Sequence, residues 1–395
     1  MPLLPVAEAQ ARMLALRGPL EIETVPLPGT VGRYAVSDIA ARRTQPALDL
    51  SAMDGYAIRF AERPGPWTVV GESAAGGGLA RALTPGEAAR IFTGAPVPEG
   101  ADVVLVQEDA THDGTRLIMS GEGPPKAGAH IRRRGGDFHE GDLLIRAGMP
   151  IGAAAIALAA SGGHGALPVR RRPRVAILST GNELVPAGEP ALGARLPASN
   201  GPMLAAMLDG LACDATDHGI VRDDLDRISA AFTALADQAD IIVTTGGASV
   251  GDHDLVLPAL QKAGAKIDFW KVAMKPGKPV MIGTLGDAVV LGLPGNPVSA
   301  FVTATLFLRP MIAHLLGSGR PIPPVRTARL GASLPATGSR AEYLRGRWLN
   351  GHAVPLDGQD SAGLSALMEA ELLIVRAPDA VTLPAGAESQ IIPLA

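Results

Sequence analysis

Three short apolar runs, each followed at once by a glycine-containing loop, constrain the fold of this chain more than any other feature. They are RVAILST (174–180), ADIIVTTGG (239–247) and DAVVLGLPG (287–295). Such β-branched runs alternate here with amphipathic segments, which is the pattern of a parallel α/β sheet covered by helices. Ligands bind such sheets beyond the carboxyl ends of the strands. The sequence therefore predicts an α/β domain whose site lies at these three loops.

The segments between and after these runs have the periodicity of helices. They are PMLAAMLDG (202–210), DLDRISAAFTALADQ (224–238), DLVLPALQKAG (254–264) and NPVSAFVTATLFLRPMIAHLLG (296–317). The last segment is long and apolar enough to be largely buried. Pro297 is tolerated at its start because first-turn amides have no helical partner.

The chain has 395 residues, too many for one ordinary core, so further domains are expected on both sides. Residues 1–20 have a helical pattern, and from Glu21 to about Phe138 short apolar runs are split by Pro and Gly, which predicts a β-rich module. The basic run 170–174 marks a boundary and is expected to be a solvated linker. After Pro321, short strands with turn residues predict a small β-barrel or sandwich.

Charge and cysteine content narrow the partners and the compartment. The formal net charge of -4 gives no positive field that would gather nucleic acid. Cys213 is the single cysteine, which excludes intrachain disulfides and cysteine-based zinc sites and favours a reducing compartment. The N-terminus lacks a signal-peptide pattern, and no run reaches the roughly 18 uncharged apolar residues of a membrane span. We therefore expect a cytoplasmic protein without nucleic-acid or membrane partners.

The second of the three loops has the composition of an anion site. Residues 244–254 (TTGGASVGDHD) combine glycines and hydroxyls before a helix, so backbone amides can approach a phosphate without an intervening side chain. We assign substrate binding to Thr245, Gly246, Gly247 and Ser249. A tight strand-to-helix turn without a ligand is the plainer alternative, and the presence of three such loops argues against it.

Three lysines in the segment KVAMKPGKP supply the positive charge that a multiply charged ligand needs. If the strand KIDFWKVAM is continuous, Lys271 and Lys275 point to the same face. Lys278 lies between a glycine and a proline, which fix its direction. Each of the first two lysines taken alone would equally suit an exposed face of a sheet.

Carboxylates near these loops form a candidate cation site. Mg²⁺ takes oxygen ligands and bridges to phosphate oxygens, so we assign Glu183, Asp252 and Asp254 as metal ligands. Asp224, in GIVRDD, is a further acidic candidate. An isolated aspartate is more often an N-cap, so Asp252 or Asp254 would alternatively only cap the next helix.

The N-terminal region adds three turn-forming motifs, SAMDGYA with Asp54, FTGAP with Thr93 and RRRGGD with Asp137. From composition alone they are loops, and residues 132–134 are a solvated basic rim. None of the eight histidines shows zinc-ligand spacing or a Ser-His-Asp pattern. Metal-hydroxide peptidase and esterase activities are therefore unsupported.

Together these strings closely resemble the MoeA family, which includes the E domain of gephyrin. SAMDGYA, TGAPVP, RRGGD, STGNEL, SNGPML, TTGGASVGDHD, KPGKP and LPGNPVSA occur in family order along nearly the whole chain. The resemblance implies a multidomain α/β plus β fold. Residues 1–170 would form an elongated helical domain with an inserted β-rich domain at about 21–138, residues 171–317 a molybdopterin-binding-like α/β domain, and residues 318–395 a small β-barrel. His253 and the second glycine of RRGGD depart from the commoner family residues.

The resemblance also implies a molybdopterin molybdenumtransferase activity, in which molybdate enters adenylylated molybdopterin and AMP is released with Mg²⁺ or a similar divalent cation. Motif matching carries catalytic roles onto Asp54, Asp137, Glu183, Asp224 and Asp254. It carries substrate-binding roles onto Thr93, Pro294, Pro297 and the three lysines. Members are homodimers whose cleft is shared between the α/β domain of one subunit and the N-terminal region of the other.

We hypothesise that the amides of residues 244–249 and the lysines hold the phosphates, while the carboxylates place Mg²⁺ on the leaving phosphate. Two alternatives stay open. Molybdopterin adenylyltransferases share the α/β domain, but the long N-terminal region argues against that activity. A non-catalytic, gephyrin-like scaffold is disfavoured because every acidic position is retained. Molybdopterin adenylyltransferase and other proteins of cofactor biosynthesis are candidate partners.

Overall fold

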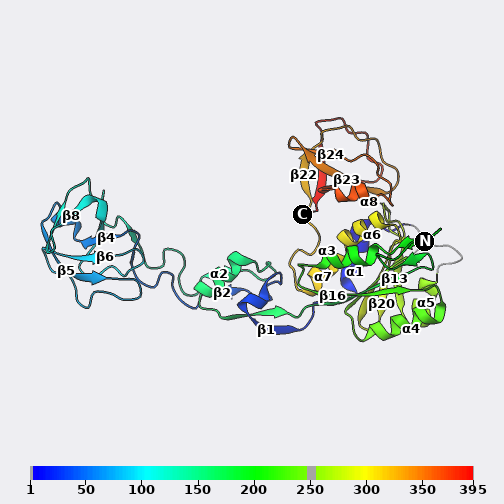
Figure 1. The fold of residues 1–395 in the computed structure, drawn as a ribbon, viewed down its shortest axis with the longest axis horizontal. Helices are drawn as coiled ribbons and strands as arrows, with labels where there is room; N and C mark the ends of the chain where they lie inside the picture. The colour runs from blue at the N-terminus through cyan, green and yellow to red at the C-terminus, as the bar shows by residue number, and fades with distance from the viewer. Residues whose placement is uncertain (1–2, 247–254, 395) are drawn as a thin grey trace. The chain divides into compact units, whose positions relative to one another are not determined.

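The computed structural model describes residues 3–246 and 255–394. The chain forms two compact units, and several elements of each are labelled in Figure 1. Unit 1 comprises residues 1–37, 147–152 and 167–395, and unit 2 comprises residues 38–146 and 153–166.

A six-stranded sheet forms the centre of unit 1, in the order β16-β13-β17-β21-β20-β18. The strands are β13 (Arg174–Thr180), β16 (Asp214–Val221), β17 (Ile241–Thr245), β18 (Lys266–Trp270), β20 (Met281–Leu285) and β21 (Ala288–Leu293). The first four in spatial order run parallel, and β20 and β18 are antiparallel to their neighbours. The three strands expected from sequence are therefore adjacent, with their carboxyl ends at one edge.

Both faces of this sheet are apolar because successive side chains of a strand point to opposite faces. Val175 and Ile177 of β13 belong to one core, together with residues of α1, α3 and the helix after β21. Ala176 and Leu178 belong to a second core, with residues of α4 and α5. The helices are α1 (Val6–Ala15), α3 (Asn200–Leu208), α4 (Leu225–Ala236) and α5 (Val256–Lys262). Near-continuous apolar strands thus follow from burial on two sides.

The helix after β21 runs from α6 (Pro297–Thr303) through a π-helical segment, η4 (Ala304–Leu308), into α7 (Arg309–Leu315). Among the described residues it is the one helix whose length and composition would suit a membrane span. However, 78% of its most apolar window is buried inside the protein. It is the core helix that the sequence predicts.

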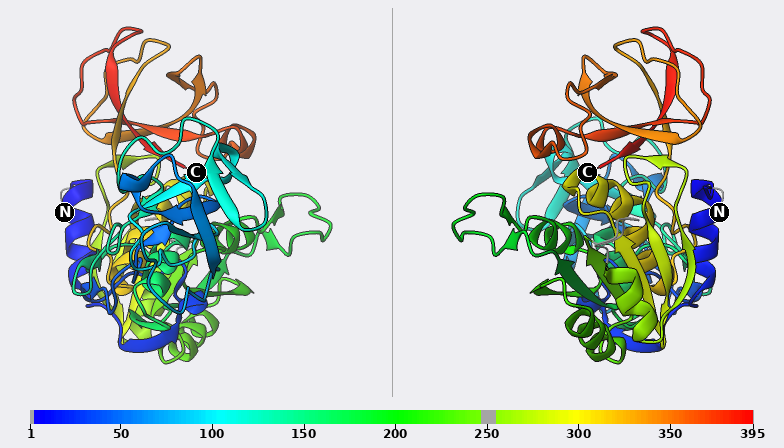
Figure 2. Two further views of the ribbon diagram at one scale, coloured as in Figure 1. Left: turned by 90° about the vertical axis from the view of Figure 1, so that its left-hand side faces the viewer. Right: turned by 90° about the vertical axis from the view of Figure 1, so that its right-hand side faces the viewer.

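A second sheet in unit 1 has the order β19-β23-β25-β26-β22, with β24 paired to β23. Its strands are β19 (Met274–Lys275), β22 (Arg326–Arg329), β23 (Ala341–Leu349), β24 (His352–Pro355), β25 (Leu372–Arg376) and β26 (Glu388–Pro393). A bridge between Leu330 and Ala353 joins the β22 end of the sheet to β24. The orange to red strands in Figure 2 accordingly curl into the expected small barrel.

The expectation of one continuous strand through KIDFWKVAM is wrong. β18 ends at Trp270 and pairs with β20 of the central sheet, whereas β19 pairs with Ala341 and Glu342 of β23. The first part of the segment therefore belongs to the central sheet and its end to the second sheet. Lys271 and Lys275 therefore do not share the face of one strand.

Unit 2 is built on a six-stranded sheet in the order β7-β4-β6-β5-β9-β8. These strands are β4 (Gly55–Ile58), β5 (Trp67–Ser73), β6 (Glu87–Ile91), β7 (Val103–Val106), β8 (Ala110–His112) and β9 (Arg116–Met119). Four shorter strands form two further pairs: β2 (Ile39–Ala40) with β11 (Leu143–Ile145), and β3 (Leu50–Ser51) with β10 (Ile131–Arg132). The unit has one α-helix, α2 (Ala153–Ser161). Unit 2 begins at residue 38, later than the Glu21 at which the sequence predicts the β-rich module to start. The reason is that β1 (Ile22–Pro26) pairs with β12 (Ala166–Arg170), most of which belongs to unit 1.

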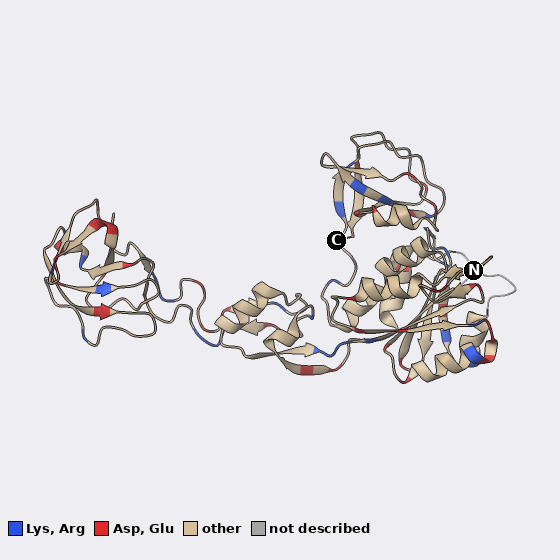
Figure 3. Cartoon of the chain, in the orientation of Figure 1, with Lys and Arg blue, Asp and Glu red and all other residues tan. Residues whose placement is uncertain are grey.

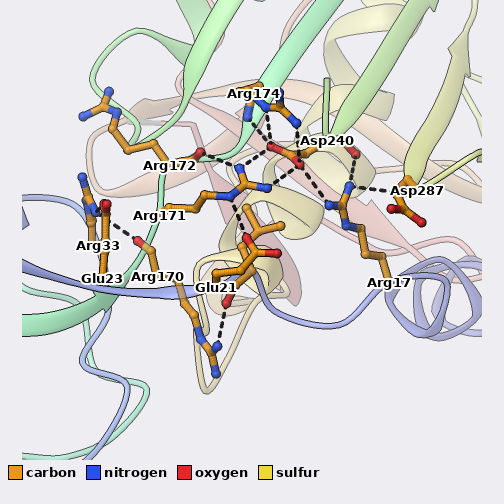
Figure 4. Close-up of polar contacts among 11 residues, drawn as sticks. Arg17, Glu21, Glu23, Arg33, Arg170, Arg171, Arg172, Arg174, Asp240 and Asp287 are labelled. Carbon is orange, nitrogen blue, oxygen red and sulfur yellow. Dashed lines mark hydrogen bonds and ion pairs between the residues drawn. The ribbon is translucent and has the colours of Figure 1, made fainter. Parts of the chain in front are cut away.

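The basic run 170–174 is not the solvated linker expected from its composition. Basic and acidic segments are interspersed along both units (Figure 3), and this run binds specific acceptors in unit 1. Arg171 and Arg174 bind the carboxylate of Asp240, which is 0% exposed, and Arg170 donates to the Leu20 carbonyl (Figure 4). The run is thus held to unit 1 by ion pairs and hydrogen bonds.

Candidate functional site

The carboxyl ends of β13, β17 and β21 open into a cavity of about 760 Å³ in unit 1. Each of the three loops contributes to its lining, with Thr180 and Glu183 from the first, Thr245 and Gly246 from the second, and residues 294–297 from the third. The loops converge as the parallel topology predicts.

The backbones of the three loops meet closely at the floor of this cavity. Gly246 has φ +88°, and a Cβ there would lie 2.4 Å from the carbonyl oxygen of Thr180. A Cβ on Gly295 would lie 3.6 Å from the Cα of Gly246. The hydroxyls of Ser179 and Thr245 are 3.3 Å apart on paired strands. Glycine is therefore required at position 246, since a side chain there would push the first loop out of place.

Two buried polar atoms of cavity-lining residues have no hydrogen-bond partner among the described residues, Thr180 Oγ1 and Asn200 Oδ1. Thr180 is 2% exposed. Asn200 donates from Nδ2 to the Gly295 carbonyl at 2.7 Å, which fixes the direction of its amide. Each of these atoms has less than 1 Å² of accessible surface, so a ligand would reach it only after its side chain or a neighbour moved. Thr180 Oγ1 can donate or accept a hydrogen bond, whereas Asn200 Oδ1 can only accept.

The loop 358–363 forms another side of the cavity, where Ala362 and, just beyond it, Leu364 line the space. Asn296 Nδ2 donates to Ser361 Oγ at 2.8 Å, and the Val298 amide donates to the Ser361 carbonyl at 3.1 Å. The loop is therefore fastened to the start of α6.

Arg345 organises that same loop from inside. Its side chain is 1% exposed and donates to the carbonyls of Gly358 at 2.8 Å, Asp360 at 2.9 Å and Gly363 at 3.2 Å. Burial lowers the pKa of the Arg345 guanidinium. Nothing in the sequence indicated this contribution, because it depends on contacts within an irregular loop.

Among the described lining residues, the charge of the cavity comes from a helix end and one carboxylate. Pro297 begins α6, and Ser299 in its first turn lines the cavity, so the positive end of the helix dipole faces the space. Glu183 is exposed, and its carboxylate lies over Gly181, where a Cβ would be 2.6 Å from Oε2. No group of three His, Cys, Asp or Glu side chains is placed to hold a metal within residues 3–246 and 255–394.

The remaining residues predicted from sequence in unit 1 lie in several places. Gly247, Ser249, Asp252 and Asp254 lie outside the described residues. The lysines are not among the described lining residues, although Pro279, next to Lys278, is. Lys275 is exposed, and its Nζ lies 3.4 Å from Glu342 Oε1. Lys271 precedes it and Lys278 follows it in the sequence. Their roles stay predictions.

Asp224 caps a helix, which is the plainer function of such a residue. It is the N-cap of α4, and its Oδ1 accepts the amide of Arg227 at 2.9 Å. Its neighbour Asp223 forms the link between the loops after β16 and β13, since its carboxylate accepts the amide of Asn182 at 3.0 Å and its amide donates back to Asn182 Oδ1 at 3.2 Å.

In unit 2 the structure brings Asp54 and Thr93 together. Asp54 Oδ1 accepts the Thr93 amide at 2.7 Å and the Thr93 hydroxyl at 2.8 Å. These two bonds hold the pKa of Asp54 below its usual value, and the positive charge of Arg90 adds to them. Asp137 is exposed, and its amide donates to the Gln45 carbonyl at 3.1 Å. Asp54 is therefore an anchored, ionised carboxylate.

Comparison with known proteins places this chain in a family. Residues 4–163 match the MoeA N-terminal region (domain I and II), residues 176–314 a probable molybdopterin binding domain, and residues 327–394 the MoeA C-terminal region (domain IV). The molybdopterin molybdenumtransferase of Haemophilus influenzae is 36% identical over 348 residues, which cover 87% of this chain and 86% of that protein. The chain belongs to the MoeA family.

Other members of the MoeA family agree in length and fold. The molybdopterin molybdenumtransferase of Bacillus subtilis is 31% identical over 388 residues, covering 94% of this chain and 90% of that protein. A crystal structure of the molybdopterin biosynthesis MoeA protein from Pyrococcus horikoshii is 26% identical with a TM-score of 0.83, covering 99% of this chain and 100% of that one. The family fold thus extends over the whole chain.

Thr180 and Asn200 are polar lining residues that sequence reasoning did not select, and it also missed Ser361, which binds the lining residue Asn296. Thr180 and Asn200 stand inside STGNEL and SNGPML, two of the strings that carry the family resemblance, so a signal was present for them. Ser361 lies in a turn-rich stretch without any motif. Its contact with the start of α6 depends on how the C-terminal barrel folds.

Proposed function

We propose that this chain is a molybdopterin molybdenumtransferase that takes molybdate and adenylylated molybdopterin, releases AMP, and requires Mg²⁺ or a similar divalent cation. The proposal includes a homodimer in the cytoplasm and the division of the chain at residues 170 and 317. The observation that carries it is the cavity at the three strand ends, in a chain whose relatives are named molybdopterin molybdenumtransferases.

The lining of the cavity supports this substrate. The described lining residues include no Lys or Arg, and they offer hydroxyls, amides and the start of α6. Lining side chains with hydroxyl or amide oxygens, which include Thr180 and Asn200, suit the N–H groups of a pterin ring. The start of α6 suits a phosphate through the positive end of its dipole and through Ser299, since Pro297 has no amide hydrogen and the Val298 amide binds Ser361. A neutral ring and an anionic group therefore find different partners within one cavity.

Glu183 is the described lining residue that would hold Mg²⁺. A single carboxylate suits this ion, since Mg²⁺ is commonly held by one or two carboxylates together with substrate phosphate oxygens. When bound, the ion would neutralise charge on the phosphate that leaves with AMP. The contribution of the chain is to orient Glu183, whose loop is tied to β16 through Asn182 and Asp223.

The activity is tested by incubating the purified chain with adenylylated molybdopterin, molybdate and Mg²⁺. Release of AMP together with molybdenum cofactor supports the proposal. Adenylylation of molybdopterin from ATP would instead indicate the adenylyltransferase, and the absence of both reactions would indicate a binding protein.

The metal role of Glu183 is tested with Glu183→Gln, which keeps the shape and removes the charge. We expect kcat to fall by about 100-fold and the Mg²⁺ concentration for half-maximal rate to rise. Affinity for adenylylated molybdopterin measured without Mg²⁺ should change by less than about 2-fold. Unchanged Mg²⁺ dependence would remove Glu183 from the metal site.

A further inference from the structure

Arg90 in unit 2 is held in one position by four neighbours. Its two terminal nitrogens donate separately, NH1 to the Gly55 carbonyl at 3.1 Å and NH2 to Gln107 Oε1 at 2.7 Å. The guanidinium carbon is 5.0 Å from the ring centroid of Tyr56 and 4.9 Å from that of Phe92. Two hydrogen bonds and two rings leave a half-buried side chain little freedom.

Two of the four neighbours of Arg90, Gly55 and Gln107, also hold the backbone of Asp54. Gly55 directly follows Asp54, and the amide of Gln107 donates to the Asp54 carbonyl at 3.1 Å. Arg90 thus binds the residue after Asp54 and the residue that holds its carbonyl. The side chain of Asp54 is held separately by Thr93, whose amide and hydroxyl both donate to Asp54 Oδ1.

The backbone next to Asp54 packs closely against the neighbouring strand of the sheet. A Cβ on Gly55 would lie 2.0 Å from the carbonyl oxygen of Leu105 on β7, so the strand containing Gly55 already lies in contact with its neighbour. The carboxylate of Asp54 is nevertheless exposed, and its Oδ2 has no partner within unit 2, all of which the structure describes. The arrangement presents one carboxylate oxygen to solvent from a rigid base.

We infer that Arg90 is a positioning residue for Asp54, which it fixes through Gly55 and Gln107 so that the free carboxylate oxygen meets the substrate in one orientation. The inference rests on the proposed function, because it concerns the same reaction. Arg90 acts through Asp54 and needs no contact with the substrate. Lysine cannot replace it, since one ammonium group cannot reach both acceptors in a planar fork or stack on the rings in the same way.

A double-mutant cycle with Asp54→Asn and Arg90→Gln in the full chain tests this inference, with AMP release as the readout. We expect Asp54→Asn to lower kcat by about 100-fold or more and Arg90→Gln to lower it by about 10-fold to 100-fold, with KM changed by less than about 2-fold in each. In the Asp54→Asn background, Arg90→Gln should cause a further loss of less than about 2-fold. Independent, multiplying losses would overturn the inference, and so would an unchanged kcat in Arg90→Gln.

The control is Arg81→Gln, which removes the same charge from the same unit. Arg81 is 51% exposed and pairs with Glu87 at 2.7 Å, so we expect kcat within about 2-fold of the unsubstituted chain. If Arg90→Gln fails to fold, as judged by its thermal transition, the cycle is run with Arg90→Lys, which keeps the charge and should still lower kcat without altering KM. If the unsubstituted chain releases no AMP, it is the proposed function that fails.

Discussion

Asp240 should be a position at which a single substitution strongly lowers the stability of unit 1. Its carboxylate is 0% exposed and accepts from Arg17 at 3.0 Å, from Arg171 at 2.6 and 2.8 Å, and from the amide of Arg174 at 2.9 Å (Figure 4). Burial alone would raise its pKa, but Arg171 and Arg174 outweigh burial and hold the pKa well below the usual range. The buried charge is therefore compensated from two segments of the chain, the one containing Arg17 and the run 170–174.

Asp240→Asn keeps the shape of the side chain and removes the charge that the arginines face. Removing one partner of a buried ion pair costs about 3 to 5 kcal/mol. The side chains of Arg17, Arg171 and Arg174 are 19%, 28% and 48% exposed, so water can partly solvate them after the change. We therefore expect the low end, about 3 kcal/mol in the free energy of unfolding.

Urea unfolding followed by far-ultraviolet circular dichroism measures this loss. The matched control is Asp214→Asn, which removes a carboxylate from the neighbouring pair with Arg172, whose side chains are 62% and 40% exposed. That change should cost less than about 1 kcal/mol. Equal effects of the two substitutions, or a loss below about 1 kcal/mol for Asp240→Asn, would refute the reasoning that burial decides the magnitude.

The pH dependence of the same difference follows from the lowered pKa. Asp240 contributes stability that is fully present above the pKa of an unfolded aspartate, about 3.9. That contribution is lost as the pH falls toward the lower pKa of the folded protein. The difference between the unsubstituted chain and Asp240→Asn should be constant above about pH 5 and shrink below about pH 4.

Two further predictions concern Thr180 and Cys213. Thr180→Val removes a buried hydroxyl without a partner among the described residues, so the unfolding free energy should stay within about 1 kcal/mol of the unsubstituted value or rise. Calorimetric titration with adenylylated molybdopterin should nevertheless show about 10-fold weaker binding, and unchanged affinity would show that the ligand does not use this oxygen. Burial raises the pKa of Cys213 to about 11. At pH 8 its reaction with a disulfide reagent should be about 100-fold slower in the native chain than in urea, and equal rates would contradict the burial of the thiol.

The part of the fold that the sequence predicted best is the part governed by local pattern. β13, β17 and β21 are buried on both faces, so their β-branched runs stand out from the surrounding helices. Parallel strands with helical crossovers place their carboxyl ends at one edge, so the convergence of the three loops followed without any knowledge of long-range contacts. The presence of Thr180 and Gly246 in the lining of one cavity follows from that topology.

The missed features depend on partners distant in sequence. The run 170–174 is basic enough to suggest a solvated surface, and only its pairing with Asp240 about 70 residues later shows otherwise. β16 was not expected because its first five residues are exposed and include Asp214, Asp217 and His218. The break between β18 and β19 arises because β19 pairs with residues near position 341. None of these contacts leaves a periodic trace in the sequence.

The ion pairs of Asp240 lie at one end of β13 and β17, and the cavity lies at the other end of the same two strands. The residues that stabilise unit 1 there are therefore distant from those that line the cavity. β13 begins at Arg174 and ends at Thr180, and β17 follows Asp240 and ends at Thr245. The 7 residues of β13 span about 23 Å at the usual rise of a strand. At that separation a unit charge contributes less than about 1 kcal/mol at an effective dielectric constant of about 20. Substitutions at Asp240 should therefore change the free energy of unfolding by about 3 kcal/mol while the affinity of the folded protein for an anionic ligand changes by less than about 5-fold.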